Sequence, residues 1–210
     1  MRIVEVVELS VPLEGAVANA VVSFAEHDVS LVALVSDVVR DGRPVVGYGF
    51  DSIGRFAQGG ILRDRMIPRL KAAEPASLLS EDGTRLDPAK VLAAAMRNEK
   101  PGGHGDRAAA AGALELAAWD LNAKLADEPA HVTIARAFGR PVGASVPVYA
   151  AGGYYYPPGS ERTLSDEFRA YADLGFDAFK MKIGGAPLAA AIVEETHSCY
   201  LGDRTHRHAW

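Results

Sequence analysis

The pattern of apolar and polar positions predicts strands in the first fifty residues. RIVEVVEL, residues 2–9, alternates apolar and polar positions, as expected for a half-buried strand. Residues 21–50 contain further β-branched runs, and Asp41-Gly42 between two of them is a hairpin signal. We therefore expect residues 2–50 to form an antiparallel sheet of about three strands.

The pattern then changes to one that is typical of helices. The helical segments are 56–72, about 87–97 and 106–126. Asp87-Pro88 reads as an N-cap followed by proline at the first helical position. Asp120 and Lys124 have the i, i+4 spacing of a supporting ion pair. One face of the last helix carries Leu114, Ala117, Leu121 and Leu125. A sheet followed by helices predicts an α+β domain over residues 1–140.

A second change begins near Ser145. SVPVYAAGG is a short apolar strand, TLSDEFRAYADLG is a helix that ends near Gly175, and FDAFKMKIGG is a second strand. Strand, helix and strand make a βαβ unit with parallel strands and a right-handed crossover. Residues 141–188 are therefore expected to begin an α/β domain.

Two lysines at the end of that second strand are the main candidates for chemistry. Lys180 and Lys182 are two residues apart, so their side chains project to the same face, ~6–7 Å apart. Ligands bind at the carboxyl ends of parallel strands. Neighbouring ammonium groups lower each other's pKa, and a lysine of lowered pKa can act as a general base. The alternative is that both lysines lie on the solvated face of an edge strand.

Composition restricts the class of protein. The 22 basic and 27 acidic residues give a net charge of −5, which favours neither nucleic acid nor an anionic membrane as partner. Cys199 is the single cysteine, so no intrachain disulfide can form, and a reducing cytoplasm is expected. No apolar run approaches the ~18–20 residues of a membrane span, and the N-terminus lacks the apolar region of a signal peptide.

Four longer segments resemble one family. GYGFDSIGRFAQGGILRDR, MRNEKPGGHGDRA, VYAAGGYYYPPG and FKMKIGGAP are similar to the enolase superfamily, in its mandelate racemase and muconate lactonizing branch, and within that branch to the D-tartrate dehydratase group. The resemblance spans residues 2–188. It implies an α+β N-terminal capping domain followed by the first βαβ of an incomplete (β/α) TIM-type barrel.

The resemblance implies roles for particular residues. Lys182 would be the base that removes the α-proton of a hydroxy-diacid. Lys180 would neutralise the substrate carboxylate and hold down the pKa of Lys182. Lys100 would bind substrate from the capping domain, and Asn19 is a weaker candidate for the same task. The segment at Asp51-Ser52 would help to close the site against water.

The resemblance also implies the reaction. Mg²⁺ would act as Lewis acid on a small-molecule carboxylate substrate, and loss of the β-hydroxyl would turn D-tartrate into oxaloacetate. A related dehydration or racemisation of another sugar acid is an alternative, as is a non-catalytic interaction module. A homo-oligomer is a further possibility.

Some aromatic and histidine residues leave two interpretations open. Tyr154, Tyr155 and Tyr156 follow the first strand of the βαβ unit, where they either line the mouth of the site or pack against the capping domain. His104, between glycines, is interpreted as a structural or exposed turn residue.

The chain departs from the family after Lys182. A complete barrel needs eight strands and ~250 residues, but about thirty residues follow Lys182. The family's metal ligands would lie on later strands, so we expect no metal site in this chain. The tail, residues 189–210, does not continue the pattern, and the spacing of His197, His206 and His208 does not suggest a metal site. These features predict a truncated, inactive form of a longer enzyme.

Overall fold

The structure is a computed structural model of the 210-residue chain, and it describes residues 1–14, 18–19, 21–25, 27–51, 58–100, 105–155, 164–182 and 184. The chain divides into two compact units. The first unit comprises Met1–Leu13 and His27–Val142, and the second comprises Glu14–Glu26 and Gly143–Trp210. The domain limits at residues 140 and 188 stay a prediction.

A three-stranded antiparallel sheet forms one layer of the first unit. Its strands, in spatial order, are β1 (Ile3–Pro12), β2 (Asp28–Arg40) and β3 (Arg43–Phe50). The β2–β3 turn is Asp41-Gly42, whose φ angles of 50° and 74° lie in the left-handed region that Asp and Gly tolerate. The predicted sheet and hairpin are confirmed.

Helices form the other layer of the first unit. The chain after β3 is helical from α1 (Gln58–Ile61) through the π-helical η1 (Leu62–Met66) to α2 (Ile67–Lys71). Beyond the 3₁₀ helix η2 (Pro75–Leu78) come α3 (Pro88–Ala95), α4 (Asp106–Ala126) and α5 (Ala130–Ala137). The Asp87 side chain accepts hydrogen bonds from the N–H groups of Ala89 and Lys90, which confirms the predicted N-cap. The short α5 was not predicted.

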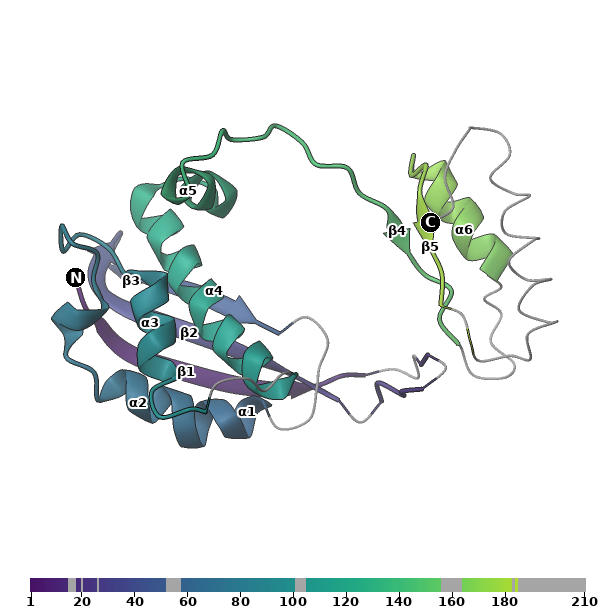
Figure 1. Ribbon diagram of the computed structural model, residues 1–210. Coiled ribbons are helices and arrows are strands. Elements are labelled where there is room, and N and C mark those ends of the chain that lie inside the picture. Colours follow the sequence, from purple (N-terminus) through teal and green to yellow (C-terminus); the bar gives the residue numbers. More distant parts are fainter. Residues whose placement is uncertain are drawn as a thin grey trace. The chain divides into compact units, whose positions relative to one another are not determined.

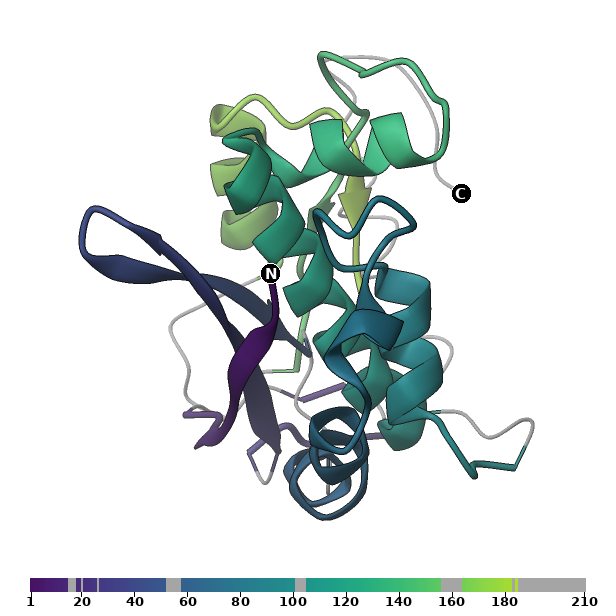
Figure 2. The same cartoon turned by 90° about the vertical axis from the view of Figure 1, so that its left-hand side faces the viewer.

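The core of the first unit lies between the sheet and α3 and α4. In Figure 1, α4 lies over β3 and β2, and in Figure 2 the helices of the first unit lie on one side of its sheet. Leu114, Ala117 and Leu121 are fully buried, and Leu125 packs partly buried beside them, which confirms the predicted face. Each fully buried leucine contributes about 1.5–3 kcal/mol of hydrophobic stabilisation. None of the described helices is long and apolar enough to cross a membrane.

The second unit contains a parallel strand pair. Strand β4 (Ala150–Ala151) pairs in parallel with β5 (Phe179–Lys180), and α6 (Leu164–Asp173) lies between them in sequence. The ring of Phe168 on α6 stacks on Phe179 at a centroid distance of 5.6 Å. The predicted order of strand, helix and strand is confirmed, although the paired strands are shorter than expected; the barrel itself stays a prediction.

The second unit also contains a segment from the connection between β1 and β2. Ala18 forms antiparallel bridges with Ser23 and with Tyr155, and the Tyr155 N–H donates to the Ala18 carbonyl at 3.0 Å. The chain from the N-terminal sheet therefore reaches the residues that follow β4. No local pattern in the sequence predicted this contact.

Candidate functional site

The lysine pair lies at the carboxyl end of β5. Lys180 is the last residue of the strand, and Lys182 follows it by two positions. Lys180 is exposed and Lys182 is half-buried; this partial burial lowers the pKa of Lys182, and the positive charge of Lys180 together with a contact between the two side chains lowers it further. The two side chains therefore converge, as the two-residue strand period requires.

An aromatic ring lies beside the Lys182 amine. Lys182 Nζ lies 5.1 Å from the centroid of the Tyr154 ring, within the range of a cation–π contact. The Phe24 ring meets Tyr154 edge to face, at 6.3 Å between centroids and an interplanar angle of 78°. Tyr154 therefore faces the lysine pair, whereas Tyr156 lies outside the described residues. Phe24 was not identified from the sequence.

Asn19 belongs to the same unit as the lysine pair. Its Oδ1 accepts the backbone N–H groups of Val21 and Val22, each at 2.8 Å, and its own N–H donates to the Val22 carbonyl at 2.9 Å. The side chain therefore closes a turn, as asparagine commonly does. Its amide oxygen is committed to that turn, and Nδ2 is the group through which it would reach a substrate carboxylate.

Lys100 belongs to the first unit and follows Glu99, which is the centre of an ionic cluster. It is exposed, whereas the neighbouring Glu99 side chain is 4% exposed and pairs with Arg65, Arg69 and Arg107 at 2.5, 2.6 and 3.1 Å. Hydrogen bonds led by that from Arg69 lower the pKa of Glu99 to about 2. Sequence reasoning missed this cluster, although the i, i+4 spacing of Arg65 and Arg69 places both on one helix face.

Asp51 directly follows β3 and is hydrogen-bonded to Ser30 on β2. It is 6% exposed, its Oδ1 accepts the Ser30 N–H at 2.9 Å, and its own N–H donates to the Ser30 carbonyl at 3.3 Å. Burial raises the pKa of its carboxyl group, and hydrogen bonds from the Ser30 N–H and from its own backbone N–H partly offset the rise. Ser52 lies outside the described residues, so the closing role of this segment stays a prediction.

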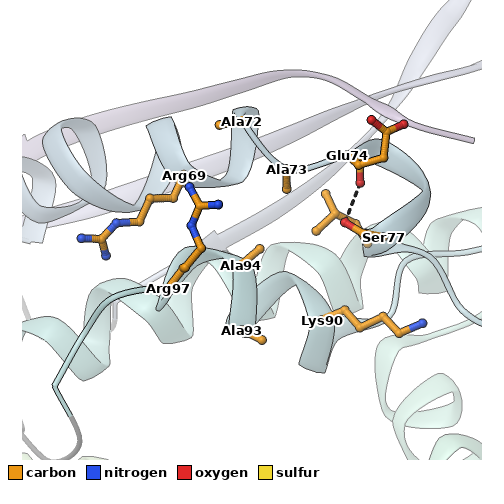
Figure 3. Close-up of a pocket in the computed structure, with 10 residues that line it drawn as sticks. Arg69, Ala72, Ala73, Glu74, Ser77, Lys90, Ala93, Ala94 and Arg97 are labelled. Atoms are coloured by element: carbon orange, nitrogen blue, oxygen red, sulfur yellow. Dashed lines mark hydrogen bonds between the residues drawn. The ribbon is translucent and has the colours of Figure 1, made fainter.

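A shallow hollow between α2 and α3 is a separate feature of the first unit. Arg69 comes from α2 and Arg97 follows α3, and both line the hollow together with Ala72, Ala73, Ala93 and Ala94 (Figure 3). At the edge of the hollow, the Ser77 hydroxyl donates a hydrogen bond to the Glu74 carbonyl at 2.6 Å. The hollow includes none of the site residues that the sequence predicted.

The described residues do not fit a magnesium centre. Within them, no group of three or more His, Cys, Asp or Glu side chains is placed to hold a metal ion. His104 and the three tail histidines, His197, His206 and His208, lie outside the described residues. The described residues supply two amines at the end of β5 and an amide in the same unit, which suit a carboxylate better than a cation.

The fold is similar to solved structures of the enolase superfamily. A mandelate racemase/muconate lactonizing enzyme-like protein from Rubrobacter xylanophilus is 26% identical with a TM-score of 0.61, over 97% of this chain and 48% of that one. The N-succinyl Arg/Lys racemase from Bacillus cereus ATCC 14579 is 17% identical with a TM-score of 0.62, over 94% and 48%. These neighbours are enzymes whose N-terminal capping domain this chain covers, and the chain spans about half of their length.

Magnesium accompanies some of these neighbours. A mandelate racemase/muconate lactonizing enzyme from Roseovarius nubinhibens ISM was solved in complex with magnesium; it is 21% identical with a TM-score of 0.58, over 98% of this chain and 51% of that one. The association with magnesium is therefore a property of those proteins. At this level of identity the likeness shows the fold alone.

Curated sequences give a different name over a short stretch. The 7-cyano-7-deazaguanine synthase of Polaromonas naphthalenivorans (strain CJ2) is 61% identical over 33 residues, which is 16% of this chain and 14% of that protein. The synthase of Parvibaculum lavamentivorans is 54% identical over 33 residues, with the same shares. No family model matches the chain.

The prediction of tartrate dehydration is wrong. The curated matches name 7-cyano-7-deazaguanine synthase, and the structural neighbours are mandelate racemase/muconate lactonizing enzyme-like proteins. The physical reason is that the segments behind the prediction specify a fold and an amine pair. Neither feature selects a hydroxy-diacid or a hydroxyl leaving group.

Proposed function

We propose that the second unit provides the base and the carboxylate-binding charge of an enzyme that removes a proton from the carbon next to a carboxylate. Lys182 is the base and Lys180 binds the carboxylate. The observation that carries the proposal is the convergence of these two amines at the end of β5, where burial and like charge lower the pKa of Lys182.

The chemistry follows from the difference between the two amines. A lysine of lowered pKa has a larger neutral fraction near pH 7, and its nitrogen lone pair can accept a proton. The charged Lys180 attracts the carboxylate and orients the neighbouring carbon toward Lys182. The electron pair of the broken C–H bond moves into the carboxylate, and the ammonium of Lys182 can return the proton. No leaving group takes part.

One further residue of the second unit belongs to the proposed binding groups. Asn19 is in the same unit as the lysine pair, and its Nδ2 is the donor for a carboxylate oxygen. Lys100 is exposed and belongs to the first unit, so its role in substrate binding stays a prediction. The proposed reaction class also draws on the names of the three neighbours above, all of which include racemase.

A binding experiment tests the proposal with mandelate as the probe carboxylate. The chain is reductively methylated with ¹³C-formaldehyde, so that each lysine gives an NMR signal, and Lys182→Arg and Lys180→Arg assign the two signals. We expect mandelate to shift both signals saturably and to leave the signal of Lys71, at the end of α2, unchanged. Equal small shifts of all lysines would contradict the proposal.

An exchange experiment tests the chemical step on the unmodified chain. In contrast to the expectation of an inactive form drawn from the family resemblance, we expect the α-proton of mandelate to exchange with deuterium in D₂O and Lys182→Met to abolish this exchange. Lys71→Met is the matched control, because it removes an exposed lysine of the first unit. Exchange that persists in Lys182→Met would remove Lys182 from the role of base.

A further inference from the structure

We propose that Tyr154 is a positioning residue for Lys182: its ring holds the lysine amine over its face, and Phe24 holds the ring. This inference rests on the role of Lys182 proposed above. It adds a residue that acts through the base, and it connects the segment between β1 and β2 to the lysine pair.

Strand pairing brings Tyr154 and Lys182 together. Ala150 pairs with Phe179 and Ala151 with Lys180 in a parallel ladder, so the residues after both strands leave from the same end of the pair. Tyr154 follows β4 by three residues and Lys182 follows β5 by two. The resulting distance of 5.1 Å between Lys182 Nζ and the ring centroid is a consequence of that register.

Residues of the segment between β1 and β2 hold the Tyr154 ring in place. Phe24 contacts it edge to face, which is a preferred geometry for two aromatic rings. The next residue, Tyr155, is bound through its backbone to Ala18, and the Asn19 turn lies between Ala18 and Phe24. One short segment therefore fixes both the backbone and the ring at this position.

The Tyr154 ring shifts the pKa of the Lys182 amine in the opposite direction from the rest of its surroundings. Burial and the charge of Lys180 favour the neutral amine, whereas the electron-rich face of the ring favours the ammonium. The ring thus offers the ammonium a fixed place after it has accepted a proton. Glu167 on α6 accepts the Gly153 N–H at 3.1 Å and the Tyr171 hydroxyl at 2.8 Å.

The test compares Tyr154→Phe with Tyr154→Leu in the ¹³C-methylated full chain. Phenylalanine keeps the aromatic face, whereas leucine keeps an apolar group but removes the ring electrons. In the wild type and in Tyr154→Phe we expect the Lys182 methyl signal to be shifted upfield by the ring. In Tyr154→Leu we expect that shift to be lost and the neutral amine to be favoured by about two- to fivefold more.

Two more variants complete the design. Phe24→Leu removes the support and is expected to reduce the upfield shift in a chain that keeps Tyr154. Tyr149→Leu, at a tyrosine 57% exposed before β4, is the control and is expected to change nothing. Circular dichroism verifies the fold of each variant, and Phe24→Leu remains informative if Tyr154→Leu unfolds.

The outcomes separate this inference from the proposed function. Identical Lys182 signals in Tyr154→Phe and Tyr154→Leu would overturn the positioning role. A higher pKa of Lys182 in Tyr154→Leu would also overturn it, because the ring would then act through burial alone. Neither readout needs turnover, so a chain that fails to exchange mandelate still tests the contact between Tyr154 and Lys182.

Discussion

The backbone of Gly49 on β3 lies directly against the carbonyl of Ala113 on α4. A Cβ atom at Gly49 would be 2.0 Å from that oxygen, and a Cβ at Gly47 would be 2.1 Å from the Ala117 carbonyl. Two strand residues span ~6.8 Å and four helix residues span ~6 Å. The Gly49–Ala113 and Gly47–Ala117 contacts therefore recur at nearly the same spacing along the strand and the helix. Helix α4 therefore packs on β3 at a distance that leaves no room for side chains.

Replacing Gly49 by alanine is expected to destabilise the first unit. The added methyl group meets helix backbone, which cannot move aside as a flexible side chain can, so we expect a loss of about 1–3 kcal/mol or more. Gly112→Ala on α4 is the control: a Cβ there has no neighbour within 4 Å, and alanine stabilises a helix interior by about 0.5–1 kcal/mol. Urea denaturation measures both, and equal stability of the two variants would refute the close contact.

Local signals were enough to predict most of the fold. The Asp41-Gly42 turn, the Asp87 N-cap and the buried face of α4 each depend on residues a few positions apart. The convergence of Lys180 and Lys182 depends on the strand period in the same way. These features are confirmed because tertiary contacts reinforce what the local sequence already favours.

Contacts between distant segments could not be predicted in this way. Phe24 contacts Tyr154, which is far from it in the sequence. Glu99 pairs with Arg69 on α2 and with Arg107 on α4. Three consecutive tyrosines follow β4, and the register of β4 against β5 decides that Tyr154 faces Lys182. The identity of the substrate was predicted wrongly for a related reason, because short segments that match a fold do not specify the ligand.

The open edge of β3 is covered by two side chains of α4. Asp120 accepts the Tyr48 N–H at 2.7 Å, and Lys124 donates to the Val46 carbonyl at 3.0 Å. We expect Asp120→Ala to lose about 1 kcal/mol of stability and to increase self-association, because it exposes an unpaired strand donor. Asp120→Asn keeps an acceptor oxygen for the Tyr48 N–H. We therefore expect it to retain most of the stability in denaturation and to self-associate little more than the wild type in light scattering. Equal losses in the two variants would argue against this hydrogen bond.

Asp51 is expected to make stability fall as pH rises from acid. Burial raises the pKa of its carboxyl group, so the folded state binds its proton more tightly than the unfolded state does. The cost of ionisation appears above the ordinary pKa of 3.8 and is complete above the raised value. Asp51→Asn keeps the acceptor for the Ser30 N–H and removes this cost. Its stability relative to wild type is therefore expected to improve between pH 4 and pH 7 in thermal melts, and a constant difference would contradict the raised pKa.

The Glu99 carboxyl group is expected to make stability fall as the pH is lowered, which is the opposite of the effect of Asp51. Its pKa of about 2 lies below the ordinary 4.5, so its ion pairs stabilise the fold above pH 4.5, and that contribution is lost as pH falls toward 2. Glu99→Gln leaves Arg65, Arg69 and Arg107 without their carboxylate and is expected to lower Tm by several degrees at pH 7. The difference from wild type should close on acidification. Glu81→Gln, at an exposed glutamate, is the control, and a pH-independent loss in Glu99→Gln would indicate packing instead of charge.

Removing the charge of Lys180 is expected to raise the pKa of Lys182. Burial is the larger cause of the lowered value and remains in Lys180→Met, so the pKa of Lys182 should rise without reaching that of an exposed lysine. Titration of the ¹³C-methylated chain measures the change directly. Added salt screens one amine from the other, so it should raise the pKa of Lys182 in the wild type and have less effect in Lys180→Met. Lys71→Met controls for the loss of one positive charge elsewhere in the chain. If Lys182 titrates identically in Lys180→Met and in Lys71→Met, the two amines do not interact, and the basis for assigning Lys182 as the base is lost.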